Sequence, residues 1–244
     1  MEPASSPKGR RVAFFGGSFD PPHLGHLAVA RTARAALALD AVLFAPVASQ
    51  PLKPQGSTAS FEDRLVMTRL AIGGELGFEL SLADAPKPSG DPNFTVDTLA
   101  DLRAGLGPDG VLFCLMGADS FFGLRRWHRS SEIPFIAPLI VASRPGQKPE
   151  DWISGLREAL PAGLAIEPAV SAGVPSADLE IRSYRIHSPD GRSAPFYLLP
   201  GVYVDISASQ IRDQVQAGSS ASTEGRVLLP QAVFDYIRSR GLYR

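Results

Sequence analysis

Two histidines follow a pair of glycines near the start of the chain, in the segment GGSFDPPHLGH at residues 16–26. Gly16 and Gly17 allow a ligand to approach the backbone closely, because they have no side chain. His23 and His26 are three positions apart, so they share one face if a helix begins there. A helix start also offers unpaired N–H groups and a positive dipole. The segment therefore predicts a phosphate-binding turn in which both imidazoles donate hydrogen bonds.

Two other interpretations of this segment stay open. Asp20, His23 and His26 together could bind a metal ion, although the sequence shows no further cluster of ligands beside them. A surface turn with two incidental histidines is the plainer alternative, but two of the four histidines in the chain fall here. We therefore take the phosphate-binding interpretation forward.

A second polar segment, ISASQIR at residues 206–212, has the composition of an anion site. Ser207 and Ser209 supply hydroxyls and backbone N–H groups at an expected helix start. Arg212 adds a fork of permanent N–H donors about one helical turn later. The segment predicts a second anion clamp, although a capped helix with a solvated arginine would give the same pattern.

The elements that must position these residues alternate along the chain. The apolar runs RVAFFGG, AVLFAPV and VLFCLMG predict buried strands. Apolar residues recur at helical spacing in LGHLAVARTARAALAL, SFEDRLVMTRLAI and FTVDTLADLRAGL, and the ending LPQAVFDYIRSRGLY predicts an amphipathic helix. This alternation predicts an α/β fold with a Rossmann-like, doubly wound parallel sheet, in which ligands bind at the carboxyl ends of strands.

Length and composition favour one domain. The chain has 244 residues, of which 44% are hydrophobic, and we expect a single domain over residues 10–244 with a flexible extension at 1–9. Proline, glycine, serine and alanine are frequent between about residues 148 and 200, where periodicity is poor. That stretch predicts a variable insertion.

Charge and motifs exclude several classes of function. A net charge of −1 argues against a nucleic-acid partner, and no segment approaches the roughly 20 apolar residues that span a membrane. No hydrophobic leader is evident, so we expect a cytoplasmic protein; a homo-oligomer stays open. The sequence contains no Walker loop, no Gly-x-Ser-x-Gly elbow and no His-Glu-x-x-His helix. GLGPDG at residues 105–110 follows a helix and precedes a strand, so it predicts a connecting turn.

The two anion clamps, in this order, resemble the nucleotidyltransferase superfamily, whose signatures are His-x-Gly-His and a serine- and threonine-rich ISSTxIR motif. Within it, GGSFDPPHLGH is similar to the pattern of bacterial nicotinate-nucleotide adenylyltransferases. Further segments agree, namely TVDTL at 95–99, MGADSFFGLRRW at 116–127, ASRPG at 142–146 and the terminal LPQAVFDYIRSRGLY. The resemblance covers nearly the whole chain except residues 148–200. It implies the nucleotidyltransferase type of Rossmann-like fold, with a small C-terminal helical part.

The resemblance implies transfer of the adenylyl group of ATP to nicotinate mononucleotide, with Mg²⁺ on the triphosphate. It makes His23, His26 and Arg212 the expected catalytic residues. By motif position it assigns ATP contacts to Gly16, Gly17, Ser18, Phe19, His23, His26, Gly117, Asp119, Ser207, Ser209 and Arg212. It assigns acceptor contacts to Lys53, Thr95, Thr98, Trp127 and Arg144. Each polar residue in the second group has a plainer role as a cap or a solvated side chain, Asp119 would also suit a helix N-cap, and Trp127 could simply pack in the core.

Two departures from the family pattern bear on the activity. The family loop reads Pro-Pro-His-Lys, whereas QPLKP at residues 50–54 places Leu52 at the histidine position. Ser209, preceded by Ala208, replaces the family threonine and keeps its hydroxyl. Alternative functions are transfer to nicotinamide mononucleotide, phosphopantetheine or a sugar phosphate, or nucleotide binding without turnover.

Overall fold

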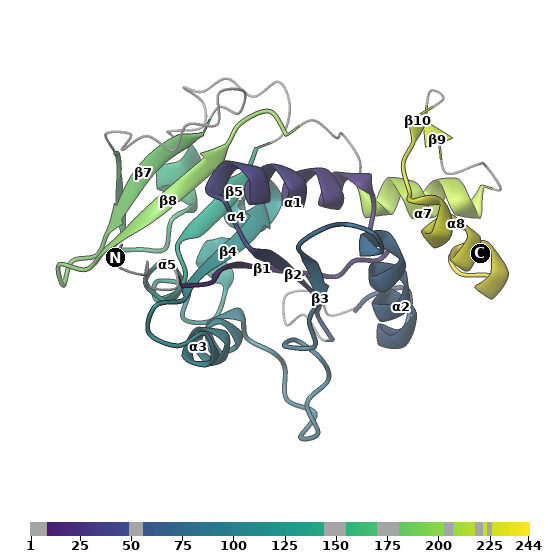
Figure 1. Cartoon of the computed structure of the whole chain (residues 1–244), viewed down its shortest axis with the longest axis horizontal. Helices are drawn as coiled ribbons and strands as arrows, with labels where there is room; N and C mark the ends of the chain where they lie inside the picture. The colour runs from purple at the N-terminus through teal and green to yellow at the C-terminus, as the bar shows by residue number, and fades with distance from the viewer. Residues whose placement is uncertain are drawn as a thin grey trace, which may run out of the picture.

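Strands and helices alternate along the chain, as the sequence predicts (Figure 1). This computed structural model describes residues 9–48, 56–143, 155–169, 181–202, 207–217, 222–223 and 226–244. The strands are β1 (Arg11–Gly17), β2 (Ala41–Pro46), β3 (Phe78–Leu80), β4 (Val111–Gly117), β5 (Leu139–Ala142), β6 (Ala165–Pro168), β7 (Arg182–His187), β8 (Ser193–Leu199), β9 (Ser222–Thr223) and β10 (Arg226–Val227). The helices are α1 (Leu24–Leu37), α2 (Phe61–Ile72), α3 (Thr95–Gly105), α4 (Ala118–Phe122), the 3₁₀ turn η1 (Leu124–Arg126), α5 (Ile133–Ile136), α7 (Ala208–Gln216) and α8 (Gln231–Arg240).

Eight strands form one sheet in the order β3-β2-β1-β4-β5-β8-β7-β6. Neighbouring strands are parallel from β3 through to β8, and β7 and β6 continue the sheet in antiparallel pairing. The chain winds outward from β1 in both directions, to β2 on one side and to β4 on the other. This confirms the Rossmann-like doubly wound sheet.

Helices cover both faces of the sheet, because alternate residues of each buried strand point to opposite sides. Val12 and Phe14 of β1 pack in one core cluster, which includes Leu99 of α3. Ala13 and Phe15 pack in a second cluster that contains the alanine-rich face of α1. Figure 1 shows α1 on one side of the sheet and α3 on the other.

The topology defines where a ligand should bind. Parallel sheets of this kind bind ligands at the carboxyl ends of strands, where the order reverses. β1 lies between β2 and β4, and Gly16 and Gly17 form its last two residues. The phosphate-binding segment predicted from the sequence therefore follows directly from the central strand at the reversal.

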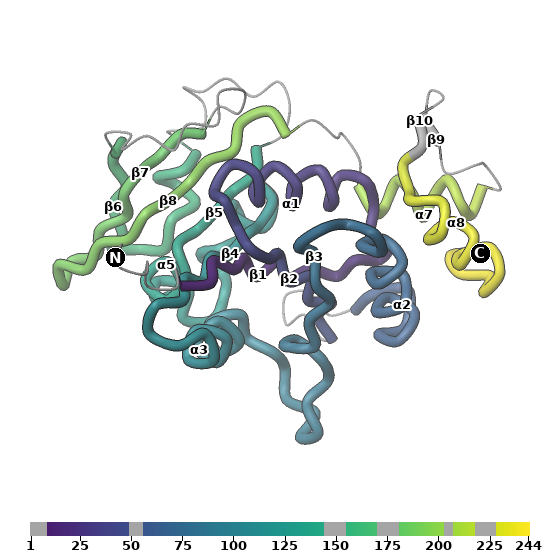
Figure 2. The backbone as a smooth tube through the Cα atoms, viewed as in Figure 1, coloured from purple at the N-terminus to yellow at the C-terminus, as the bar shows by residue number. Residues whose placement is uncertain are grey.

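The C-terminal helices form a small unit of their own with α2. Met67 and Ala71 of α2, Ile211 of α7, and Val233 and Ile237 of α8 bury their side chains in a third apolar cluster. In Figure 2 the tube that follows β1 passes beside α2 and α7 before it enters α1. The small C-terminal helical part is thus placed against the candidate site.

In the part of the chain that the structure describes, no helix has both the length and the apolar character needed to cross a membrane.

The stretch at 148–200 contributes to the sheet where it is described. β6, β7 and β8 lie within it and extend the sheet beyond β5. Its interpretation as a variable insertion, the flexible extension at 1–9 and the single-domain assignment stay predictions.

Candidate active site

The glycines at the end of β1 are needed for packing as well as for ligand approach. A Cβ atom at position 16 would lie 2.8 Å from the ring of Phe14, and one at position 17 would lie 3.4 Å from the ring of Phe19. A Cβ atom at position 16 would also lie 3.5 Å from Oδ2 of Asp84. A side chain at position 16 would therefore have to displace the ring of Phe14, whereas position 17 has little room to spare beside Phe19.

Phe19 shapes the turn from inside the core. Its backbone has φ 47°, a left-handed conformation that is uncommon for a residue with a large side chain. Its ring is 2% exposed and lies with centroids 5.6 Å from Phe15, 5.6 Å from Phe44 and 5.0 Å from His26. Phe19 is therefore a buried residue that packs beside His26, and its contact with ATP stays a prediction.

The two histidines lie together at the start of α1, as their spacing predicts. His23 is the N-cap residue and His26 the third helical residue, and their ring centroids are 3.8 Å apart. The backbone N–H of His23 donates to Nδ1 of His26 over 3.1 Å. Nδ1 of His26 therefore acts as the acceptor, which assigns the proton of the neutral ring to Nε2. Nε2–H of His26 remains as the ring's donor.

Burial keeps both imidazoles neutral in the free protein. It lowers the pKa of His23 to about 4. Burial and the neighbouring His23 lower the pKa of His26 well below its ordinary value. Nδ1 of His23 is buried without a hydrogen-bond partner among the described residues, which is costly unless a ligand supplies one.

One expected donor at this helix start is occupied. The backbone N–H of Leu24 donates to the carbonyl of Leu228 over 3.0 Å, so it is not free to bind an anion. The sequence could not show this contact, because Leu228 lies about 200 residues further along the chain. The bond instead ties the C-terminal unit to the first turn of α1.

The second predicted clamp lies against the first. Ser207 is the N-cap of α7, and its hydroxyl accepts from the backbone N–H of Gln210 over 3.2 Å. Arg212 donates from Nη1 to the carbonyl of Asp20 over 2.8 Å and from Nη2 to Oγ of Ser209 over 3.2 Å. None of its other N–H donors has a partner among the described residues. The hydroxyl of Ser207 already caps the helix, so Arg212 is the strongest anion-binding group of this segment.

β4 ends beside β1 and leads into α4. Gly117 is the N-cap of α4, and a Cβ atom there would meet nothing within 4 Å. Asp119 is an exposed residue in the first helical turn, so it is not the N-cap that the plainer interpretation suggested. There is open space beside the backbone of Gly117, and its ATP contact stays a prediction.

Two of the predicted acceptor residues, Thr95 and Thr98, lie in the first turns of α3. Phe94 is its N-cap and Thr95 its first residue, so Thr95 is not the cap. Thr98 is buried, and its hydroxyl donates to Oδ1 of Asp84 over 2.6 Å. Trp127 is partly buried against the core, and the next residue, His128, places its ring 4.3 Å from that of Phe94. Thr98 therefore reaches the site through Asp84, which lies beside Gly16.

Some predicted positions lie outside the described residues, namely Lys53, Arg144 and Leu52. The structure gives no account of their contacts. Their roles stay predictions.

The sequence analysis missed three residues that hold the site together, namely Arg64, Asp84 and Tyr243. Arg64 is 1% exposed and donates from Nη1 to the carbonyl of Ser18 over 2.7 Å. Asp20, considered only as a metal ligand, accepts hydrogen bonds through its carboxylate from Thr58, Ala59 and Tyr243. These three hydrogen bonds use most of the acceptor capacity of the carboxylate, which disfavours the metal-ligand interpretation. In the sequence, Arg64 is visible only as a charged residue within the predicted helix FEDRLVM. A single sequence does not show whether such a side chain is buried or exposed to solvent.

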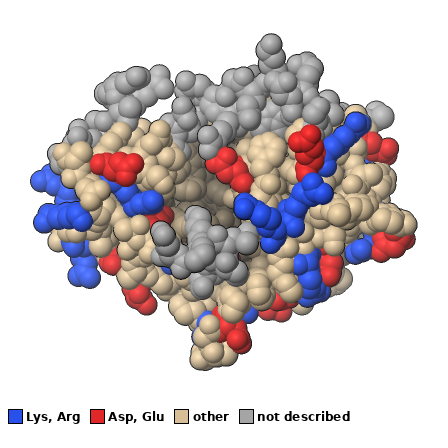
Figure 3. Space-filling view, turned by 180° about the vertical axis from the view of Figure 1, so that it is seen from behind, with Lys and Arg blue, Asp and Glu red and all other residues tan. Residues whose placement is uncertain are grey.

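Seen from behind, the surface is hollowed near its centre, and Lys and Arg side chains stand beside the hollow (Figure 3).

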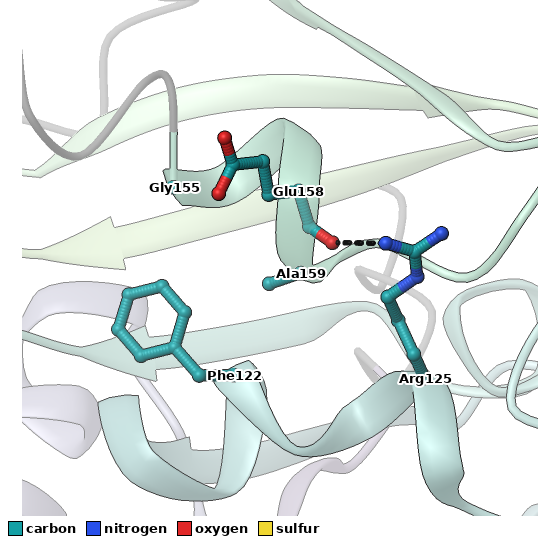
Figure 4. Close-up of a pocket in the computed structure, with 5 residues that line it drawn as sticks. All are labelled: Phe122, Arg125, Gly155, Glu158 and Ala159. Carbon is teal, nitrogen blue, oxygen red and sulfur yellow. Dashed lines mark hydrogen bonds between the residues drawn. The ribbon is translucent and has the colours of Figure 1, made fainter.

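A separate cleft of about 410 Å³ is lined by Phe122, Arg125, Gly155, Glu158 and Ala159 (Figure 4). There Arg125 donates from Nη1 to the carbonyl of Glu158 over 2.8 Å. None of the predicted site residues lines this cleft, and it brings together no set of polar groups comparable to that around β1.

Comparisons with known proteins agree with this geometry. Residues 14–214 match the family model described as cytidylyltransferase-like. A probable nicotinate-nucleotide adenylyltransferase of Stenotrophomonas maltophilia is 39% identical over 236 residues, covering 95% of this chain and 96% of the relative. One from Citrifermentans bemidjiense is 38% identical over 233 residues, covering 96% and 98%. The solved Plasmodium falciparum nicotinic acid mononucleotide adenylyltransferase, complexed with NaAD, aligns with a TM-score of 0.66 at 15% identity over 96% of this chain and 97% of that one, which shows a shared fold.

Proposed function

This chain belongs to the nicotinate-nucleotide adenylyltransferases within the cytidylyltransferase-like family, and we propose that it transfers the adenylyl group of ATP to nicotinate mononucleotide. The products are nicotinate adenine dinucleotide and pyrophosphate, and the reaction is a step of NAD biosynthesis. The observation that best supports this proposal is the hydrogen bond between Arg212 and Asp20, which are 192 positions apart in sequence. It brings the two donor-rich segments together at one turn.

The chemistry of such a site is alignment and charge stabilisation. A phosphate oxygen of the acceptor forms a bond to the α-phosphorus of ATP, while the bond from that phosphorus to the bridging oxygen breaks and pyrophosphate leaves. The attacking phosphate is already ionised, so no general base is needed. The described residues around β1 accordingly supply hydrogen-bond donors rather than an activated nucleophile.

His26 and Arg212 are the residues that would stabilise the leaving pyrophosphate. Neutral His26 offers Nε2–H, and Arg212 offers the N–H donors that Asp20 and Ser209 do not use. A bound triphosphate favours the protonated form of a nearby imidazole, so its arrival raises the pKa of both histidines from their lowered values. Charge on these rings would then increase as negative charge develops on the leaving group.

A divalent cation fits this site as a companion of ATP, and we take it to be Mg²⁺. Among the described residues, no three histidine, cysteine or acidic side chains lie close enough to enclose a metal ion. Mg²⁺ commonly binds through substrate phosphates and water rather than an all-protein cage. The cation would supply charge neutralisation on the triphosphate.

The acceptor is expected on the α3 side of β1. The N–H groups of Thr95 and Val96 start α3, and the aromatic ring of His128 packs against Phe94, the N-cap residue of this helix. That placement favours a ligand with both an anionic group and an aromatic ring. The cytoplasmic location and the oligomeric state stay predictions of the sequence.

Pyrophosphate release from the purified protein with Mg-ATP tests the proposed function. We expect release with nicotinate mononucleotide and much less with its amide or with phosphopantetheine. Release with the amide alone would reassign the acceptor. Binding of ATP without release from any acceptor would contradict the proposal and favour a non-catalytic nucleotide-binding protein.

A further inference from the structure

The penultimate residue of the chain reaches the phosphate-binding turn. The hydroxyl of Tyr243 donates to Oδ1 of Asp20 over 2.7 Å, across 223 positions of sequence. Tyr243 is 9% exposed and Asp20 is 5% exposed, so this bond is shielded from water. The backbone of Tyr243 has φ 61°, in the left-handed region that is unfavourable for a bulky side chain. The fold therefore holds the phenol there in spite of a local conformational cost.

Asp20 joins several segments of the site through its other contacts. Its carboxylate also accepts from the backbone N–H groups of Thr58 over 2.6 Å and Ala59 over 3.1 Å. Its carbonyl accepts from Nη1 of Arg212 over 2.8 Å. Hydrogen bonds to its carboxylate thus fix the side chain of Asp20, and its backbone carbonyl holds the candidate catalytic residue Arg212. A shift of Asp20 would move the guanidinium of Arg212.

A buried arginine completes this arrangement. Arg64 donates from Nη1 to the carbonyl of Ser18 over 2.7 Å and from Nε to the carbonyl of Ala59 over 3.3 Å. Burial lowers the pKa of Arg64, and the negative charge of Asp20 opposes that effect. The attraction between a buried carboxylate and a buried guanidinium offsets the cost of burying their charges only when their hydrogen bonds are satisfied. The geometry around Asp20 and Arg64 is therefore sensitive to the loss of one hydrogen-bond donor.

We infer that Tyr243 is a positioning residue for adenylyl transfer, because its hydroxyl fixes Asp20 and Asp20 in turn holds Arg212 toward the triphosphate. The inference rests on the proposed function. In this role Tyr243 contacts neither substrate, and it acts only through Asp20 and Arg212. A displacement of about 1 Å in a group that aligns a reaction can cost up to about a hundredfold in rate.

The Tyr243→Phe variant removes this hydroxyl and keeps the ring in the core. We expect kcat/KM for ATP to fall about tenfold, with an unchanged KM for nicotinate mononucleotide. Tyr236→Phe is the matched control, because Tyr236 also joins a phenol to a carboxylate between α8 and α2, donating to Oδ1 of Asp63 over 2.9 Å. The control should keep its turnover, and thermal unfolding measures the stability that each variant loses.

A double-mutant cycle separates positioning from a general loss of structure. If Tyr243 acts through Arg212, then adding Tyr243→Phe to Arg212→Ala should cause no further loss of kcat/KM. Additive losses, a Tyr243→Phe enzyme with normal turnover, or equal losses in the Tyr236→Phe control would each overturn the inference. If the parent protein releases no pyrophosphate, the proposed function fails on its own. Affinity for a non-hydrolysable ATP analogue, measured across the same variants, then tests the positioning of Arg212.

Discussion

In the free protein, the neighbours of His26 determine which hydrogen bond its ring can donate. At neutral pH the ring is uncharged, and the backbone N–H of His23 occupies Nδ1. The ring therefore offers one defined donor, Nε2–H, from a fixed position beside Phe15 and Phe19. A preorganised donor of this kind stabilises charge that develops in the transition state more than it binds the ground state.

We expect His26→Ala to lower kcat by about a hundredfold to a thousandfold, because it removes that donor. Steady-state release of pyrophosphate measures the effect, and circular dichroism checks the fold. His187→Ala is the control, since His187 is an exposed imidazole on β7 that pairs with Glu167 over 2.9 Å. Near-normal turnover of His26→Ala would remove His26 from the catalytic group.

His23 should make stability depend on pH. Its folded pKa of about 4 lies below the unfolded value of about 6.5, so the unfolded chain binds the proton first as pH falls. The full stability is present above about pH 6.5, and about 3 kcal/mol of it is lost as pH falls toward 4.

Urea unfolding of the parent and of His23→Asn at several pH values between about 7.5 and 4.5 measures this loss. The difference between the two proteins isolates His23, because the acidic groups titrate in both. The parent should lose more stability than the variant across this range. Parallel curves would show that the pKa of His23 is not lowered by folding.

At the scale of elements, α3 is attached to the sheet edge by one buried polar pair. Thr98 donates to Asp84, and burial raises the pKa of that carboxyl while the Thr98 hydrogen bond opposes the rise. Asp84 also lies beside Gly16, so this pair connects the acceptor side of the site to the end of β1. The orientation of the first turn of α3 depends on it.

Thr98→Val keeps the shape of the side chain and removes the donor. We expect a loss of about 1–3 kcal/mol at neutral pH, because the buried carboxylate loses a partner. The variant also raises the folded pKa of Asp84 further above its unfolded value, so this loss grows as pH rises and is smaller near pH 4.

Thr68→Val is the matched control for this change. Thr68 is equally buried, but its hydroxyl donates over 2.7 Å to the carbonyl of Arg64 in the same helix, which involves no charge. The loss of stability in Thr68→Val should be smaller than that in Thr98→Val and independent of pH. Equal losses in the two variants at every pH would contradict the role given to Asp84.

The sequence specified most elements locally. Ser60 caps α2 within its own local segment, because its hydroxyl accepts from the backbone N–H of Asp63 over 3.0 Å. Ser207 caps α7 in the same way. Expectations for caps failed at Asp119 and Thr95, where Gly117 and Phe94 occupy the cap positions. At neither of those two helices does the side chain of the N-cap residue form a capping hydrogen bond.

At the scale of the whole molecule, the C-terminal unit completes the site. α7 and α8 pack on α2, Leu228 binds the first turn of α1, and Tyr243 binds Asp20. The last two of these contacts connect the end of the chain to the phosphate-binding turn. The double-mutant cycle on Tyr243 and Arg212 tests whether this connection serves catalysis or stability alone.

The amino-acid sequence was enough to predict the alternation of strands and helices, the pairing of His23 with His26 and the family motifs, because these depend on residues near one another in the chain. It could not predict that Arg212 binds Asp20, that the carbonyl of Leu228 accepts from the N–H of Leu24, or that Asp84 lies beside Gly16. Each of these contacts joins segments distant in sequence. Periodicity and motif spacing carry no information about such pairs, since only the packing of the sheet and its helices brings them within hydrogen-bond distance.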